Sequence, residues 1–156
     1  MPLSPPPLDK HGRVMPHNRA GIGPTDGIIR RISEQWIVDG PGGIEQRSSM
    51  AFNPSSGPNG RMSVDLQAQI EEAGLNCREF LSTTTPQYTG SVRFETGKLR
   101  EAGLQVGFDP LPTNPHHGEV WGKFTDSMRK RTLPSLASWF VEIPGVAISA
   151  RPASRS

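Results

Sequence analysis

The chain has 156 residues and a formal net charge of +2, and its 17 glycines and 16 prolines make up about a fifth of it. This length suits one ordinary domain, and no apolar run approaches the ~20 residues of a membrane-spanning helix. The single cysteine, Cys77, excludes an intramolecular disulfide and a zinc site of several cysteines. We therefore expect a small intracellular, cytoplasmic domain without a membrane partner.

The two ends of the chain differ in composition from its middle. Residues 1–26 contain six prolines and almost no apolar periodicity, and they lack an apolar run of signal-peptide length. Residues 144–156 end in a Ser-, Ala- and Arg-rich stretch. We predict a disordered Pro-rich arm over 1–26, one domain over 27–143 and a disordered tail over 144–156.

Alternating apolar residues in the first half of the domain indicate four strands. We place them at 27–32, 35–38, 47–53 and 62–66. The last two strands flank a Gly- and Pro-rich loop and are expected to form a hairpin. Asp65 is expected to cap a helix over 66–73, with Leu66, Ile70 and Ala73 buried and Gly74 at its end. A further helical turn is expected at 77–81.

The second half predicts a strand, a short helix and another strand, at 91–95, 98–102 and 104–108. Thr96 is expected to cap this helix and Gly103 to end it. A strand at 118–124 follows, and then a basic helix capped by Thr125 or Asp126. Pro134 begins a last helix that buries Leu136, Ala137 and Phe140. The predicted fold is α+β, a single domain with a small mixed or mostly antiparallel sheet and two to four helices.

The stretch from Asp109 to His117 is a loop with three prolines, which stiffen it. It delivers His116 and His117 to the start of a strand. Glu119 lies two residues further on, so its side chain shares a face with that of His117, about 7 Å away. We select His116, His117 and Glu119 as candidate catalytic residues, because the group suits acid–base chemistry or a divalent metal. Alternatively, the histidines hold the loop through backbone carbonyls.

Five residues are candidates for binding a substrate: Arg30, Arg31, Ser49, Asp109 and Trp121. The two arginines point to opposite faces of their strand, and a guanidinium group binds phosphate well. A salt bridge with Glu34 or Glu45 is the alternative role. The strand carrying Trp121 leaves open whether its indole is exposed or covered by a helix.

Two further motifs are short and also have simpler interpretations. His117-Gly118-Glu119 matches the H-x-E half of a zinc deaminase, but the P-C-x-x-C half is absent. The cluster Arg129-Lys130-Arg131 suits nucleic-acid phosphates, although no aromatic residues for base stacking surround it. A solvated helix face is the alternative for this cluster.

The chain also resembles known proteins in two ways. The order of Arg31, Ser49 and Glu119 is similar to that of some ADP-ribosyltransferases, in which an arginine holds the NAD phosphates and a glutamate steadies the ribose; the second glutamate of that family is absent here, and Trp121 stands in its place. Residues 27–143 resemble a group of short prokaryotic proteins that share an SSxAF…SVD…DPLPxNPxH pattern. The second resemblance implies a bacterial, cytoplasmic protein of one compact domain and no particular activity.

We expect a small binding or accessory domain that acts through the surface of the Pro-rich loop, with a protein partner or a small phosphorylated ligand. The alternatives are an enzyme that uses His116 or His117 with Glu119 on a phosphorylated or nucleotide substrate, and a nucleic-acid-associated protein. From the sequence we assign no metal ion and no cofactor.

Overall fold

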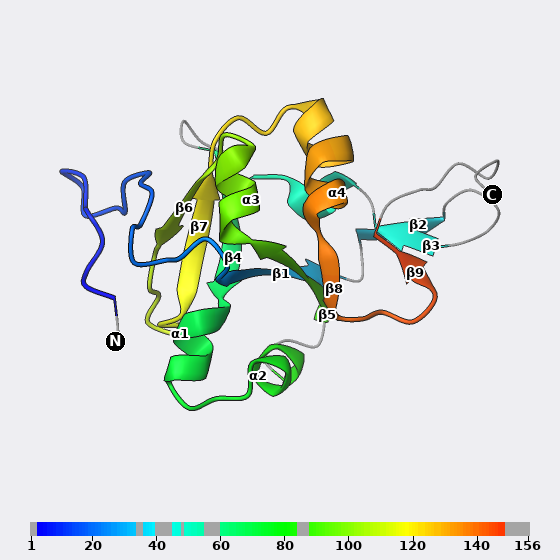
Figure 1. Cartoon of the computed structure of the whole chain (residues 1–156), viewed down its shortest axis with the longest axis horizontal. Coiled ribbons are helices and arrows are strands. Elements are labelled where there is room, and N and C mark those ends of the chain that lie inside the picture. The colour runs from blue at the N-terminus through cyan, green and yellow to red at the C-terminus, as the bar shows by residue number, and fades with distance from the viewer. Residues whose placement is uncertain are drawn as a thin grey trace.

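The structure is a computed structural model that describes residues 3–33, 36–39, 45–47, 49–54, 60–83 and 88–148. Its centre is a six-stranded sheet with the order β6-β7-β4-β1-β5-β8, in which every neighbouring pair is antiparallel. The strands of this sheet are β1 (Gly27–Ser33), β4 (Arg61–Leu66), β5 (Tyr88–Glu95), β6 (Gln105–Phe108), β7 (His117–Trp121) and β8 (Ser138–Val141). Figure 1 shows the sheet crossing the molecule with helices packed around it. The predicted α+β class is confirmed.

A second, three-stranded sheet lies on the far side of the molecule from β6 (Figure 1). It has the order β2-β3-β9 and contains β2 (Ile37–Asp39), β3 (Glu45–Arg47) and β9 (Val146–Ala147). Because β9 pairs with β3 and Val146 is buried, folded structure extends beyond the predicted boundary at residue 143. Residues 149–156 of the predicted tail lie outside the described residues.

Helices cover both faces of the large sheet. They are α1 (Gln67–Glu72), α2 (Cys77–Thr83), α3 (Thr96–Glu101) and α4 (Leu133–Leu136). Leu99 of α3 packs with Ile28 in the larger core cluster, whereas Ile70 of α1 and Leu81 of α2 pack with Ile29 in the smaller one. Successive strand residues point to opposite faces, so these two clusters lie on opposite sides of β1. Within the described residues, no helix is both long enough and apolar enough to span a bilayer.

The predicted hairpin between residues 47–53 and 62–66 is wrong. Ser49–Phe52 forms a 3₁₀ helix, and β4 pairs with β1 and β7. The 3₁₀ geometry directs the side chains of both Ala51 and Phe52 into the core, where they are fully buried. In a strand, these two side chains would point to opposite faces. The Phe52 ring packs edge-on against Phe94 at 5.5 Å between ring centroids.

The predicted last helix is also shorter than expected. α4 begins at Leu133 and ends at Leu136, and Ala137 is already extended with ψ 143°. Residues 138–141 then form β8, which pairs with β5. A strand edge offers a row of backbone hydrogen-bonding groups, and pairing with that edge overrides the helical spacing of Leu136 and Phe140.

The helix ends follow the sequence in part. Gly74 and Gly103 have φ of +81° and +91° after α1 and α3, which confirms their role in ending these helices. Thr125 accepts a hydrogen bond from the backbone of Met128, as expected of a cap. Asp65 and Thr96 do not cap their helices: Asp65 binds Arg31 on β1, and the Thr96 hydroxyl donates to the backbone of Asp26. Ala73 is exposed, although its spacing in the predicted helix indicates a buried position.

The second half of the N-terminal arm packs along the free edge of β6 and is the blue segment beside this strand in Figure 1. The Arg19 backbone N–H donates to the Val106 carbonyl at 2.9 Å, and Ile22 is only 4% exposed. The predicted boundary at residue 26 therefore does not separate the arm from the domain. Composition alone missed this contact because the arm is held by the hydrogen-bonding groups of a distant strand edge, not by an apolar pattern of its own.

Candidate functional site

Strands β4 and β7 bring a row of polar side chains onto one face of the large sheet. Ser63 lies opposite Glu119, and Asp65 lies opposite His117. Side chains two residues apart on a strand share a face, so the two pairs are neighbours. Asp109 follows β6 directly, and its backbone N–H donates to the His117 carbonyl at 3.0 Å. The neighbouring strands β6 and β7 thus bring Asp109, His117 and Glu119 together.

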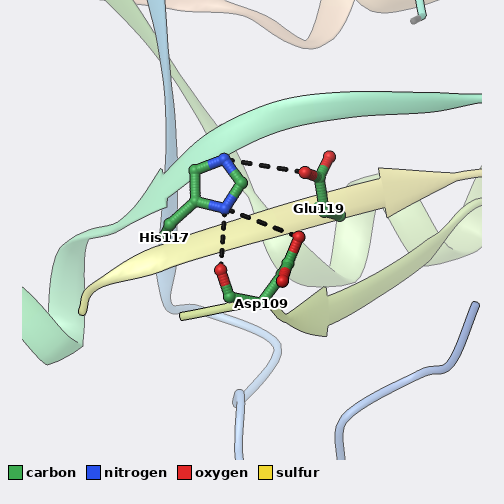
Figure 2. A group of neighbouring side chains, drawn as sticks. All are labelled: Asp109, His117 and Glu119. Atoms are coloured by element: carbon green, nitrogen blue, oxygen red, sulfur yellow. Dashed lines mark hydrogen bonds and ion pairs between the residues drawn. The ribbon is translucent and has the colours of Figure 1, made fainter. Parts of the chain in front are cut away.

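These three side chains form a compact group, which we call the Asp–His–Glu cluster (Figure 2). His117 Nδ1 lies 2.8 Å from the backbone oxygen of Asp109 and 3.8 Å from its Oδ2. His117 Nε2 lies 3.6 Å from Glu119 Oε1. Each residue offers one potential ligand atom, and these atoms all lie within 4.8 Å of one another.

The cluster is buried but retains access to solvent. The side chains of His117 and Asp109 are 10% and 12% exposed, and that of Glu119 is 3% exposed. Burial raises the pKa of Glu119 to about 7, and the neighbouring Asp109 carboxyl acts in the same direction. Arg61 and a hydrogen bond from the Ser63 hydroxyl oppose this rise in pKa.

The Glu119 carboxyl is incompletely satisfied. Its Oε1 accepts a hydrogen bond from Ser63 at 3.4 Å, whereas its Oε2 is buried and has no hydrogen-bond partner among the described residues. Buried polar atoms are nearly always paired, since desolvation without a partner is costly. Two buried carboxyl groups beside one imidazole can move protons, or they can hold a divalent cation.

The Pro-rich loop that precedes β7 is held at both of its ends. Leu111 and Asn114 exchange backbone hydrogen bonds within the loop. The Asn114 side chain donates to Asp65 Oδ1 at 2.7 Å and accepts from the His116 backbone at 3.1 Å. The Asn114 side chain therefore fixes the position of the loop against β4, whereas the prolines stiffen the loop itself.

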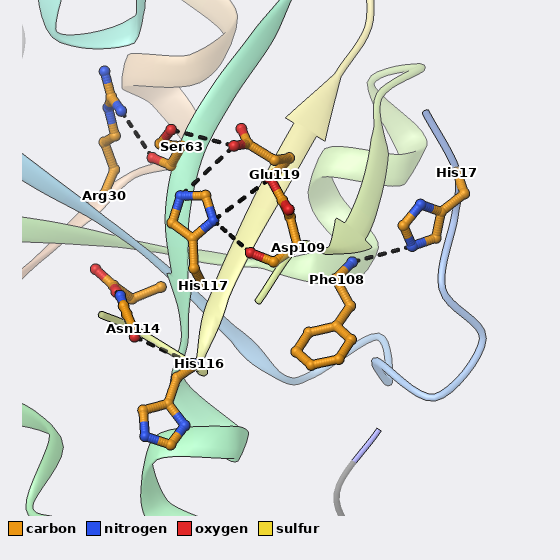
Figure 3. A network of polar contacts seen from close by, with 10 residues as sticks. His17, Arg30, Ser63, Phe108, Asp109, Asn114, His116, His117 and Glu119 are labelled. Carbon is orange, nitrogen blue, oxygen red and sulfur yellow. Dashed lines mark hydrogen bonds and ion pairs between the residues drawn. The ribbon is translucent and has the colours of Figure 1, made fainter. Parts of the chain in front are cut away.

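The structure separates the two adjacent histidines, His116 and His117, that the sequence predicts to act together. His116 points away from the Asp–His–Glu cluster (Figure 3), and its ring packs edge-on against Phe80 at 5.7 Å between centroids. It lines a cavity of about 330 Å³ together with Phe108, Pro110 and Pro115. Burial lowers the pKa of His116, and Asp65 opposes this effect. Successive side chains of an extended segment point in opposite directions, so only one of the two can join the cluster.

The candidate substrate-binding residues lie at different places. Arg31 shares the face of the cluster but binds Asp65, with 2.8 Å between Nε and Oδ2. Arg30 points to the other face, where it donates to the backbone of Ala51 and lies over the Trp36 ring. Ser49 is in the 3₁₀ helix, and nothing is described of its side chain. Of the two glutamates expected to pair with one of these arginines, Glu34 lies outside the described residues, and nothing is described of the Glu45 side chain.

Trp121 is buried at the end of β7, two residues from Glu119. The His17 ring, which belongs to the N-terminal arm and not to a helix, packs against the indole at 5.2 Å between centroids. The His17 Nε2 atom also accepts a hydrogen bond from the Phe108 backbone at 3.1 Å (Figure 3). His17 belongs to the arm that the sequence had assigned to disorder, so its place beside the cluster could not be found from periodicity.

Sequence reasoning also missed Ser63 and Arg61. Both lie on the same face of β4 as Asp65, at the alternate positions that a strand prescribes. The sequence predicts the alternation of β4 but pairs this strand with residues 47–53. Without the β4–β7 register, nothing in the sequence places Ser63 beside Glu119.

The basic cluster at 129–131 lies in a π-helical turn, Met128–Thr132. Arg129 donates to the Asn53 side chain at 2.7 Å and also binds Asp126. At least this member of the cluster is therefore engaged within the domain, and it connects the turn to the segment after the 3₁₀ helix.

None of the family models, curated proteins and solved structures compared with the chain matches it. The geometry of the Asp–His–Glu cluster is therefore the basis for an assignment of function.

Proposed function

We propose that this protein is a small binding domain that holds one divalent transition-metal ion between Asp109, His117 and Glu119. The observation that carries the proposal is the Asp–His–Glu cluster itself, whose three potential ligand atoms lie within 4.8 Å of one another. The buried Glu119 Oε2, which has no partner among the described residues, supports it further, because a cation would satisfy that oxygen.

The donor set favours particular ions. One imidazole nitrogen and two carboxylate oxygens suit Zn²⁺ or Mn²⁺, whereas Mg²⁺ and Ca²⁺ prefer oxygen ligands alone. Zinc ligands lie about 2.0–2.2 Å from the ion, so opposite ligand atoms are at most ~4.4 Å apart. Small side-chain rotations would therefore bring the three residues from their present spacing to that of a bound ion.

The surroundings of His117 also support metal binding. A carbonyl oxygen only accepts hydrogen bonds, so Nδ1 must donate to the Asp109 backbone, and Nε2 carries the lone pair in the neutral ring. A metal-binding histidine usually donates its second ring N–H to a carbonyl or carboxylate, which fixes the ring. Three protein ligands leave at least one coordination position for water or for a bound molecule.

The test is calorimetric titration of chelator-treated protein with Zn²⁺, Mn²⁺ and Mg²⁺. We expect one site per chain for Zn²⁺ or Mn²⁺, with much weaker binding of Mg²⁺. In Glu119→Gln, the affinity should fall at least ~10-fold, the lower range for removal of a group that supports a metal site. Glu101→Gln is the matched control, because Glu101 is an exposed glutamate on α3.

Circular dichroism shows whether each variant folds, and His117→Gln provides a second ligand variant. The proposal fails if folded wild-type protein binds Zn²⁺ and Mn²⁺ no more tightly than Glu119→Gln and His117→Gln do. Equal loss of affinity in Glu101→Gln would contradict it too, because binding would then depend on general surface charge.

A further inference from the structure

The charges around the Asp–His–Glu cluster do not balance once a cation is present. Arg61 is the cation that acts on Glu119, and the nearby Arg31 is compensated by Asp65. With the carboxyl groups of Asp109 and Glu119 ionised, the cluster and Arg61 carry a net charge of −1. A divalent ion changes this net charge to +1, although the site is largely buried.

Arg61 is placed to meet a molecule bound at the ion. It lies at the start of β4, opposite Trp121 and two residues before Ser63, which faces Glu119. Its side chain therefore stands on the same face, about 7 Å along the strand. Arg61 is half-buried, and within the described part of the chain its guanidinium has no hydrogen bond or salt bridge.

Resting on the proposed metal site, we propose that the domain binds a phosphate group between the metal ion and the Arg61 guanidinium. One phosphate oxygen occupies the coordination position that the three protein ligands leave open, and other oxygens accept hydrogen bonds from Arg61. The anion neutralises the positive charge that the ion creates. The ligand class is therefore a small phosphorylated molecule, which enters on the side where His117 and Asp109 retain some exposure.

Phosphate fits this arrangement better than a carboxylate does. The planar guanidinium fork binds two phosphate oxygens at once, and a tetrahedral phosphate still has another oxygen directed to the ion. A carboxylate has only two oxygens, so it can engage the ion or the fork fully, but not both.

The experiment measures the binding of methyl phosphate to Mn²⁺-loaded and chelator-treated protein by calorimetry, with acetate as a second probe. We expect the Mn²⁺-loaded wild type to bind methyl phosphate, and the chelator-treated protein and the acetate titration to give little binding. Arg61→Gln should weaken methyl phosphate about tenfold or more, as expected for loss of charge-assisted hydrogen bonds. Lys98→Gln is the control, because Lys98 is an exposed cation on α3.

The affinity for Mn²⁺ itself separates this role from a structural one. Arg61→Gln removes a charge that repels the ion, so it should bind Mn²⁺ at least as tightly as the wild type does. A variant that has lost its structure would bind both Mn²⁺ and methyl phosphate more weakly. If Mn²⁺ binds but methyl phosphate affinity is unchanged in Arg61→Gln, the phosphate proposal is overturned and the metal site stands. If the wild type binds no transition-metal ion, both proposals fail.

Discussion

His117 Nδ1 donates a hydrogen bond to the backbone oxygen of Asp109 across 2.8 Å, within a buried part of the sheet. A carbonyl oxygen has no proton to give, so this contact determines the tautomer of the neutral ring. The Nε2 lone pair is then directed toward Glu119. We expect the neutral His117 ring to carry its proton on Nδ1 in the metal-free protein. Long-range ¹H–¹⁵N correlation spectra give the tautomer of each histidine directly; a proton on Nε2 would contradict the arrangement.

The pair of Arg31 and Asp65 connects β1 to β4 and, through Asn114, to the Pro-rich loop. The Asp65 side chain is 5% exposed, and removal of one partner of a buried ion pair is strongly destabilising. Asp65→Ala should lower the free energy of unfolding by about 3 kcal/mol, measured by urea denaturation.

The control for this pair is Glu101→Ala, which breaks the exposed pair of Lys98 and Glu101. Because solvent screens such a pair, the loss should be about 0.5 kcal/mol or less. Equal effects of Asp65→Ala and Glu101→Ala would show that burial does not strengthen the Arg31–Asp65 pair.

The arm is attached to β6 by His17, whose two ring nitrogens both have partners. Nδ1 donates to the Met15 carbonyl at 2.8 Å, and Nε2 accepts from the Phe108 N–H. His17→Ala leaves that N–H without its partner and removes the ring from Trp121. Tryptic cleavage after Arg19 should then accelerate about tenfold, in line with the loss of a hydrogen bond to a backbone group.

His11→Ala is the matched control, because the hydrogen bond from His11 to Asp9 comes from its backbone N–H and does not need the imidazole. It should leave the rate of cleavage unchanged. Unaltered cleavage in His17→Ala would mean that the imidazole does not hold the arm to the sheet.

Gly118 stands between His117 and Glu119 because the core side of β7 has no room there. A Cβ atom at this position would lie 2.6 Å from Leu66 Cδ2 and 2.8 Å from the backbone oxygen of Gly107. Gly118→Ala should destabilise the fold by about 1–3 kcal/mol, the usual cost of overpacking. Thermal denaturation measures this loss. At Gly23 the nearest atom is 3.5 Å away, so Gly23→Ala should have little effect, and similar losses in both variants would exclude the steric explanation.

Cys77 is a buried thiol at the start of α2. Burial raises its pKa to about 11, and the acidic side chains of Glu71 and Asp65 add to this rise. In the unfolded chain the thiol titrates near its ordinary value of 9.0. Between pH 9 and 11 the unfolded state therefore loses the proton first, and stability falls as the pH rises through this range.

The same thiol should be slow to react with a disulfide reagent at pH 8 in the folded protein and fast in denaturant, because the thiolate is the reactive form. Stopped-flow absorbance measurements with and without urea give the reaction rates of the denatured and the folded protein. Cys77→Ala should have a shallower loss of stability between pH 9 and 11. Equal rates in folded and denatured protein would contradict the protection of Cys77.

Several elements could be predicted from local sequence because their causes are local. The apolar alternation of residues 27–32 and 62–66 fits β1 and β4, and Gly74 and Gly103 end their helices with a positive φ. The Pro-rich loop and the shared face of His117 and Glu119 also follow from the chemistry of neighbouring residues. The sequence by itself thus determined the α+β class and the placement of His117 and Glu119 on one face of a strand.

Strand partners and distant contacts were decided only by the tertiary structure. Residues 138–141 have a helical spacing, yet they form a strand because β5 offers an open edge. Ser63 reaches Glu119 through the pairing of β4 with β7, 56 residues apart in the chain. His17 docks on β6 although its own segment has no apolar pattern. Pairing depends on which edges and faces remain available once the rest of the chain has folded, and no local pattern of residues contains that information.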